Sequence, residues 1–449
     1  MNRRSILLGA AAGAGLTSPV GAQSARKVQT LSAVLSNGLS LWCRPNDSAE
    51  LVAIVCLVRA SLAEERENQA GIAALTAESL VRGSMAHTQE SFGGAVLRVG
   101  AGVSALPGYD HCEFTLVTSR DRFEQALKLM AELLTQPRFA AKDVADTRDR
   151  LKKRAETLGE DFTGASYQTL VHELYPDHPY GRLMTGYPES LDPLTADDVR
   201  TFWQRYYVQN RMFLGIVGDV QPAAAIDLTQ KAFRDAPFRR GDEAPRAPSA
   251  RLKGPRVQLL TRNGPMAQIM AGFLAPPANR KDYAVYTLLD AIIGGGKRSR
   301  LFTDLREKQG LGYEMGSLYQ PLRQQSHLAG YVLTPAFKRQ PSSDVLTGLI
   351  EPVKEQLLKQ YRDLAAAGPT DAELQRARSY VVGKQALKLE RMRDQARALA
   401  WNGAMGLGND FDSYFAQRVA ATTKDEIQAA AKGLVGEYAL VVTVPPPTP

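Results

Sequence analysis

The chain repeats one order of secondary structure, and this repeat limits its fold more than any other feature of the sequence. In each copy strands come first, helices follow, and a capped helix then leads into a final strand. A threonine three positions before an acidic residue, which is typical of a helix capping box, starts that helix in both copies. The boxes are Thr195/Asp198 and Thr423/Glu426, and the strands after them are 213–217 and 438–444. The copies are offset by about 215 to 230 residues. We therefore predict an α+β protein of two similar halves, each with an antiparallel-rich sheet flanked by helices.

A linker separates the two copies. Residues 237–255 are rich in proline, arginine and alanine and show no hydrophobic periodicity, which is typical of a connecting segment. A chain of 449 residues is long enough for two domains with a core each. We predict an N-terminal domain at 23–236 and a C-terminal domain at 256–449. Within the second, a capping box at Thr370 predicts a long helix toward Ala400.

The first 22 residues have the pattern of an export signal. Two adjacent arginines, Arg3 and Arg4, precede a short apolar run rich in alanine and glycine, and small residues surround Ala22. The arginine pair favours a twin-arginine signal peptide, and we expect the mature protein in a bacterial periplasm. The run is too short and too glycine-rich for a stable membrane span, so we expect none after cleavage. An uncleaved anchor is the alternative.

The charge of the chain argues against a nucleic acid partner, and its cysteines allow two interpretations. The net charge of +8 falls to +6 once the two arginines of the leader are removed, and no long basic run suggests a nucleic acid partner. The chain contains three cysteines. Cys43 and Cys56 lie on successive strand-like runs, where a cross-strand disulfide is possible in an exported protein. Free buried thiols are the other possibility, because cysteine is a common core residue.

The stretch from Gly294 to Tyr313 combines three glycines, a short amphipathic helix and a closing glycine. Its sequence is GGGKRSRLFTDLREKQGLGY, followed by alternation that predicts a strand starting at Tyr313. Gly310 lies where a left-handed residue would end the helix. A helix end joined to a strand by a tight turn would direct Arg306 and Tyr313 to one point. Both side chains donate hydrogen bonds to oxygen, so the pair suits a peptide carbonyl or a carboxylate.

The order of elements and several motifs resemble the insulinase/pitrilysin family of zinc peptidases, most of all its two-domain bacterial branch related to mitochondrial processing peptidase. The motifs are Asn37-Gly38-Leu39, GIAALTAESLVRGS at 71–84, YPDHPYGR at 175–182, IVGDV at 216–220 and SRLFTDLREKQGLGY at 299–313. The resemblance covers nearly all of the mature chain. It implies a clamshell of two metallopeptidase-like halves around a peptide chamber. It also implies that Arg306 and Tyr313 bind the substrate backbone opposite a zinc ion.

The zinc motif of the active family members is missing. That motif, HxxEH, places two histidines on one helix face to hold zinc and a glutamate to activate water. Aligning the flanking glycines puts its two histidines and its glutamate at Ala74, Glu78 and Ala77. The further acidic ligand of the family is expected near Arg154 or Ala155, and the acidic residue Glu156 lies one or two positions away. No two of the five histidines are four residues apart, and we predict no metal and no cofactor on this chain; the histidines are His87, His111, His172, His178 and His327.

The sequence thus retains one half of the family's site and lacks the other. The resemblance implies a non-catalytic subunit that supplies Arg306 and Tyr313 to a homologous partner subunit bearing HxxEH and zinc. The substrate would be a peptide or an unfolded protein. A structural or peptide-binding protein without enzymatic output is the alternative, and a peptidase with an unusual metal site is a third possibility.

Overall fold

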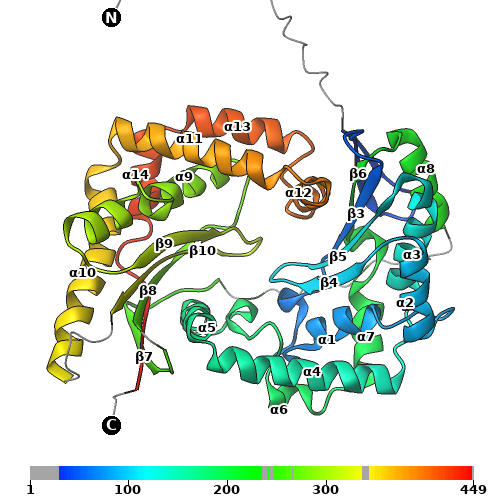
Figure 1. Ribbon diagram of the computed structural model, residues 1–449, viewed down its shortest axis with the longest axis horizontal. Coiled ribbons are helices and arrows are strands. Elements are labelled where there is room, and N and C mark those ends of the chain that lie inside the picture. Colours follow the sequence, from blue (N-terminus) through cyan, green and yellow to red (C-terminus); the bar gives the residue numbers. More distant parts are fainter. Residues whose placement is uncertain are drawn as a thin grey trace, which may run out of the picture.

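The computed structural model describes residues 30–234, 241, 247, 249–264, 266–335 and 343–446. The chain forms two halves, each with one sheet and a set of helices, which face each other as a clamshell (Figure 1). The predicted signal peptide at 1–22 and most of the predicted linker at 237–255 lie outside the described residues. In the described residues, we find no helix that combines the length and the apolar character needed to cross a membrane.

The first half is built on a six-stranded sheet. Its strands are β1 (Leu31–Val34), β2 (Ser40–Pro45), β3 (Leu51–Val58), β4 (Val103–Pro107), β5 (Cys112–Ser119) and β6 (Met212–Gly218). Their order is β1-β2-β6-β3-β5-β4, and β2 and β6 are the parallel pair among otherwise antiparallel neighbours. The interior strand β6 is buried throughout, as its continuous apolar run requires.

The first half also contains a set of helices. They are α1 (Ile72–Leu80), α2 (Gln89–Arg98), α3 (Phe123–Thr135), α4 (Ala141–Glu160), α5 (Phe162–Leu174), α6 (Pro188–Leu191), α7 (Ala196–Tyr206) and α8 (Pro222–Ala232). The predicted capping box at the start of α7 is confirmed. The Thr195 hydroxyl accepts a hydrogen bond from the backbone N–H of Asp198, and the Asp198 carboxylate accepts one from the backbone N–H of Thr195. α1 packs against α4 and α7 beneath β4.

The second half repeats the topology of the first. Its strands are β7 (Arg256–Thr261), β8 (Met266–Ala275), β9 (Glu314–Gln320), β10 (Ser326–Pro335) and β11 (Ala439–Val444). The order β7-β11-β8-β10-β9 matches β2-β6-β3-β5-β4 strand for strand, and the pair β7/β11 is parallel like β2/β6. The predicted duplication is therefore present in the sheets themselves.

The helices of the second half are α9 (Tyr283–Gly294), the π-helix η6 (Phe302–Lys308), α10 (Ser343–Ala367), α11 (Asp371–Lys388), α12 (Met392–Ala404), α13 (Phe411–Ala421) and α14 (Lys424–Lys432). The capping boxes at Thr370 and Thr423 are confirmed. The single helix predicted from Thr370 toward Ala400 is wrong, since the chain breaks between Lys388 and Met392 and turns into α12.

That break lets the two halves exchange helices. α12 leaves the second half and packs on β3 and β6 of the first, while α5 of the first half packs on β8 and β11 of the second (Figure 1). Glycines permit both contacts. A Cβ on Gly215 of β6 would overlap the carbonyl oxygen of Ala396, and a Cβ on Gly272 of β8 would lie 2.9 Å from Leu174. Each half therefore completes the core of the other.

Polar contacts reinforce the exchange. The Arg397 guanidinium of α12 donates to both carboxylate oxygens of Glu113 on β5, at 2.6 and 2.7 Å. Arg44 donates to Asp412 at 2.8 Å, and the Trp42 indole donates to Asn409 at 2.5 Å. The Glu113 side chain is only 9% exposed, so its charge depends on this pairing.

The cysteines are all free and buried. A disulfide between Cys43 and Cys56 is wrong, because β6 lies between β2 and β3 and the two residues pair with Ile216 and Leu214 of β6. Burial raises the pKa of each thiol to about 12, so the thiols remain protonated at neutral pH.

Candidate functional site

Helix α1 corresponds to the zinc-motif helix of the resemblance, and buried polar groups fix its first turn. The Glu65 carboxylate accepts hydrogen bonds from the backbone of Gly71 and Ala73 at 3.0–3.1 Å. Gly71 has φ +94°, and a Cβ there would lie 2.7 Å from the Cα of Gly186. Glycine is therefore required where the helix begins. Burial raises the pKa of Glu65 to about 8.

The three positions of the missing zinc motif lie together on α1. Ala74 and Ala77 are fully buried, and the Glu78 side chain is 11% exposed. Arg154 of α4 donates from Nη1 to Glu78 Oε1 at 2.5 Å, and Arg150 lies 3.6 Å from Glu78 Oε2. The single carboxylate of the motif is thus already paired with guanidinium groups.

These residues do not fit a zinc ion. Two alanines offer no donor atom, and a structural or catalytic zinc site takes three or four protein ligands. The positive charge that zinc would supply is supplied by Arg154 and Arg150 instead. The sequence placed the downstream acidic ligand near Arg154 or Ala155; Arg154 is the residue that faces Glu78. Arg150 was missed, although its spacing of four from Arg154 puts both on one helix face.

No other group of histidine, cysteine and carboxylate residues forms a metal site within the described part of the chain. The histidines have structural partners or are buried alone. His327 lies between the hydroxyls of Tyr167 and Tyr175, at 2.9 and 3.0 Å, and burial lowers its pKa to about 3. His178 accepts from the backbone of Tyr180 and contacts Gln324.

Arg306 and Tyr313 are brought together at the surface of the second half. Gly310, with φ +65°, ends η6 in the left-handed conformation predicted for it, and the backbone of Leu311 donates to the carbonyl of Leu305 at 2.7 Å. The turn places the Arg306 guanidinium 5.9 Å from the centroid of the Tyr313 ring. Tyr313 is 63% exposed, and its backbone donates to Leu333 at 2.7 Å, one residue before β9 begins.

The pair is available for a ligand. Stacking over the Tyr313 ring, and over Phe302 at 5.5 Å, orients the guanidinium without using its hydrogen-bond donors. The helix that carries Arg306 is a π-helix rather than the expected α-helix. Such wide turns occur often at functional sites. An oxygen atom placed between the guanidinium and the phenol could accept from both.

Two family models match the chain. One is described as "Insulinase (Peptidase family M16)" and matches residues 44–185; the other, "Peptidase M16 inactive domain", matches residues 193–381. An uncharacterized zinc protease of Mycobacterium leprae is 24% identical over 371 residues, covering 82% of this chain and 81% of the relative. An uncharacterized zinc protease of Streptomyces coelicolor is 26% identical over 375 residues, covering 80% and 76%.

Solved structures share the fold. A peptidase M16 inactive domain from Pseudomonas fluorescens superposes with a TM-score of 0.83 at 20% identity, covering 94% of this chain and all of that one. A protease from Helicobacter pylori also gives 0.83, at 19% identity over 93% of this chain and all of that one. The two models of one family together span most of the chain, and the duplicated sheets and the predicted motifs agree with them. The chain belongs to the insulinase family of peptidases, family M16, as a member without the HxxEH motif.

Proposed function

We propose that this protein is the zinc-free subunit of a periplasmic insulinase-family peptidase, and that it presents Arg306 and Tyr313 to a peptide held at a partner's zinc. The observation that supports the proposal most is the contrast between its two halves. The second half keeps an exposed guanidinium and phenol side by side, whereas the first half holds an arginine–glutamate pair where zinc would be bound. The partner is a homologous subunit with an intact HxxEH motif.

The chemistry assigned to the pair is positioning and charge stabilisation. Two donors directed at the carbonyl oxygen of the scissile bond would hold the substrate and stabilise the negative charge that develops on that oxygen. This chain supplies neither the metal nor the water-activating glutamate, so we expect it to have no peptidase activity alone. The leader at 1–22 supports a periplasmic location, where the substrate would be a peptide or an unfolded protein.

The test is reconstitution with the HxxEH-bearing homologue from the same genome. Hydrolysis of a quenched fluorescent peptide is followed for each purified chain alone and for the mixture of the two. We expect cleavage only in the mixture, and a reduction of about 100-fold with Arg306→Ala, comparable to the loss of one oxyanion donor. The matched control is Arg200→Ala, which removes an exposed guanidinium from α7 of the first half. Equal activity of the Arg306→Ala and Arg200→Ala mixtures would show that the proposed role is wrong.

The second candidate is a binding or structural protein without enzymatic output. The Glu78–Arg154 pair favours this candidate, because a guanidinium replaces the metal beside the nearly buried Glu78 carboxylate. If the two chains form a stable complex whose cleavage rate equals that of the zinc subunit alone, this second candidate is the better description.

A further inference from the structure

Three cavities follow one another along a single face of α11. They have volumes of about 430, 210 and 320 Å³. The first and second share Tyr380 and Ala291, and the second and third share Gln385 and Lys388. The opposite wall is α9 with the segment 294–298 after it, which we call the glycine loop, and β9 contributes Tyr319. We call this continuous depression the α11 trough; it ends against His111 of the first half, at the junction between the halves.

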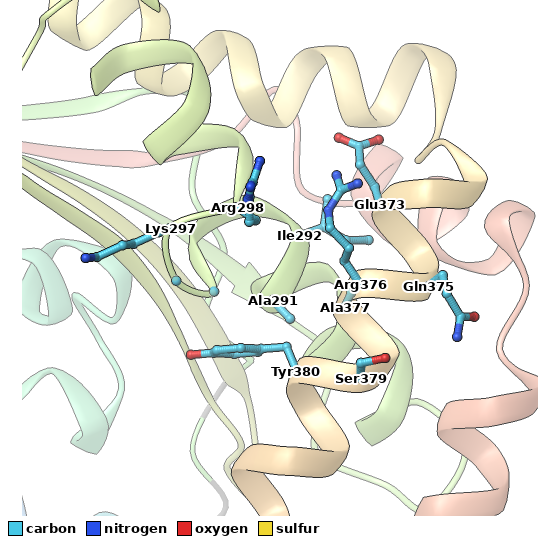
Figure 2. Close-up of a pocket in the computed structure, with 12 residues that line it drawn as sticks. Ala291, Ile292, Lys297, Arg298, Glu373, Gln375, Arg376, Ala377, Ser379 and Tyr380 are labelled. Carbon is cyan, nitrogen blue, oxygen red and sulfur yellow. The ribbon is translucent and has the colours of Figure 1, made fainter. Parts of the chain in front are cut away.

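Three of the cations along the trough lie in one row on α11, together with a tyrosine. Arg376, Tyr380, Lys384 and Lys388 are four residues apart and so lie in one row along α11. Figure 2 shows Arg376 facing Arg298 of the glycine loop across the first cavity, with Tyr380 at one end of it. The Lys297 side chain extends from the loop away from α11.

These cations have no acidic partners in the described residues. No carboxylate lies within ion-pairing distance of Arg298, Arg376, Lys384 or Lys388, and all four are exposed. The acids along the trough are used elsewhere: Glu373 pairs with Arg300, Asp394 with Arg397, Asp412 with Arg44, and Asp290 accepts from Ser317. The trough therefore carries a net positive charge.

The spacing of the row matches an extended chain. Residues four apart on a helix are separated by a rise of about 6 Å, and alternate side chains of an extended peptide are separated by about 6.6 Å. From Arg376 to Lys388 the row extends about 18 Å, the length of five or six extended residues. Apolar surface lies between the charges, from Ile292, Tyr283 and Trp401.

We propose that the α11 trough binds an extended polypeptide segment with acidic side chains at alternate positions. The segment would be a stretch of the substrate, and this identification of its source rests on the function proposed above. The trough would then select acidic sequence beside the cleavage point, while Arg306 and Tyr313 bind backbone. Arg298, Arg376, Lys384 and Lys388 are specificity-determining rather than catalytic residues.

The experiment uses the isolated chain, so it needs neither zinc nor a partner. Fluorescence anisotropy measures binding of three labelled six-residue peptides with glutamate, glutamine or lysine at alternate positions. We expect the glutamate peptide to bind, the other two to bind at least about tenfold more weakly, and binding to weaken with added salt. The double variant Lys384→Gln/Lys388→Gln should weaken binding of the glutamate peptide by about tenfold, because it removes two exposed ion pairs between these lysines and the glutamates of the peptide.

The matched control is Lys153→Gln/Lys432→Gln, which lowers the net charge equally at exposed sites on α4 and α14. Equal weakening by the two double variants, or equal binding of the glutamate and glutamine peptides, overturns the proposal. An oligothymidine of equal charge that binds as tightly as the glutamate peptide also overturns it, since the site would then recognise charge and not peptide. The assay contains neither zinc nor a partner subunit, so failure of the trans-acting role and failure of the trough can be told apart.

Discussion

Gly215 lies in β6, where α12 of the second half crosses the sheet of the first. A Cβ added there would lie closer than 3.0 Å to two backbone atoms of Ala396. Both sides of the contact are main chain, so no side chain can rotate away. We therefore expect Gly215→Ala to push α12 outward and weaken the helix exchange that joins the halves.

The loss in free energy of unfolding caused by Gly215→Ala can be estimated from the side chains that α12 covers. Leu399 packs with Trp42 and Phe213 in a buried cluster at this junction. Full burial of a side chain of this size contributes about 1.5–3 kcal/mol. A gap of about 1 Å loses up to about half of the contact energy. Losing about a third to a half of the contribution of three such side chains gives roughly 3 kcal/mol. This agrees with the upper end of the range of about 1–3 kcal/mol for overpacking.

The measurement is urea-induced unfolding followed by tryptophan fluorescence, which reports on Trp42 and Trp401 at the junction. The control is Gly93→Ala in α2, where an added Cβ meets nothing within 4 Å. Alanine should stabilise that helix by about 0.5–1 kcal/mol relative to glycine. Gly215→Ala should lower the urea midpoint, and Gly93→Ala should raise it slightly. If both variants shift the midpoint in the same direction by similar amounts, the close packing of α12 is not what joins the halves.

Two further predictions concern charge. Burial alone would raise the pKa of Glu113, but the hydrogen bonds and charge of Arg397 lower it below its ordinary value. A lowered folded-state pKa stabilises the fold above the unfolded value of about 4.3, and this stabilisation is lost as the pH falls through the folded-state pKa. Arg397→Gln should therefore cost about 2 kcal/mol at pH 7 by urea unfolding, less than a fully buried pair because Arg397 is 35% exposed. The cost should shrink as the pH falls through the folded-state pKa of Glu113, and a cost independent of pH would contradict this. The purified chain, incubated with zinc and desalted, should retain far less than one equivalent by elemental analysis, and stoichiometric zinc would show that the Glu78–Arg154 pair does not exclude the metal.

Much of the fold could be predicted because it is encoded locally. The capping boxes at Thr195, Thr370 and Thr423 involve residues three positions apart, so their hydrogen bonds depend on little beyond the helix itself. The left-handed turn at Gly310 likewise depends on the glycine itself and on the end of the helix before it. Repetition of such local signals at a fixed offset was enough to predict two similar halves, which the matching sheets confirm.

The features that were missed depend on contacts between distant residues. The break after Lys388 has no glycine or proline to mark it, since the chain turns there in order to place α12 on the other half. The order β2-β6-β3, which separates Cys43 from Cys56, requires a strand more than 150 residues away in sequence. The row Arg376, Tyr380, Lys384 and Lys388 on α11 has a visible period of four, but only α9 and the glycine loop make it one wall of a trough.

At the zinc-motif positions of α1, the missing ligands are visible in the sequence, whereas the partner of the remaining carboxylate is visible only in the structure. The sequence shows that both ligand histidines and the catalytic glutamate are absent at Ala74, Ala77 and Glu78. The structure adds that Arg154 occupies the position facing the one remaining carboxylate. A nearly buried carboxylate without a partner would be costly, and the guanidinium offsets that cost in the way a metal cation would. The sequence predicts the family's further ligand near Arg154, so we expect that restoring HxxEH on α1 would not restore a metal site by itself, because a guanidinium faces position 78 there.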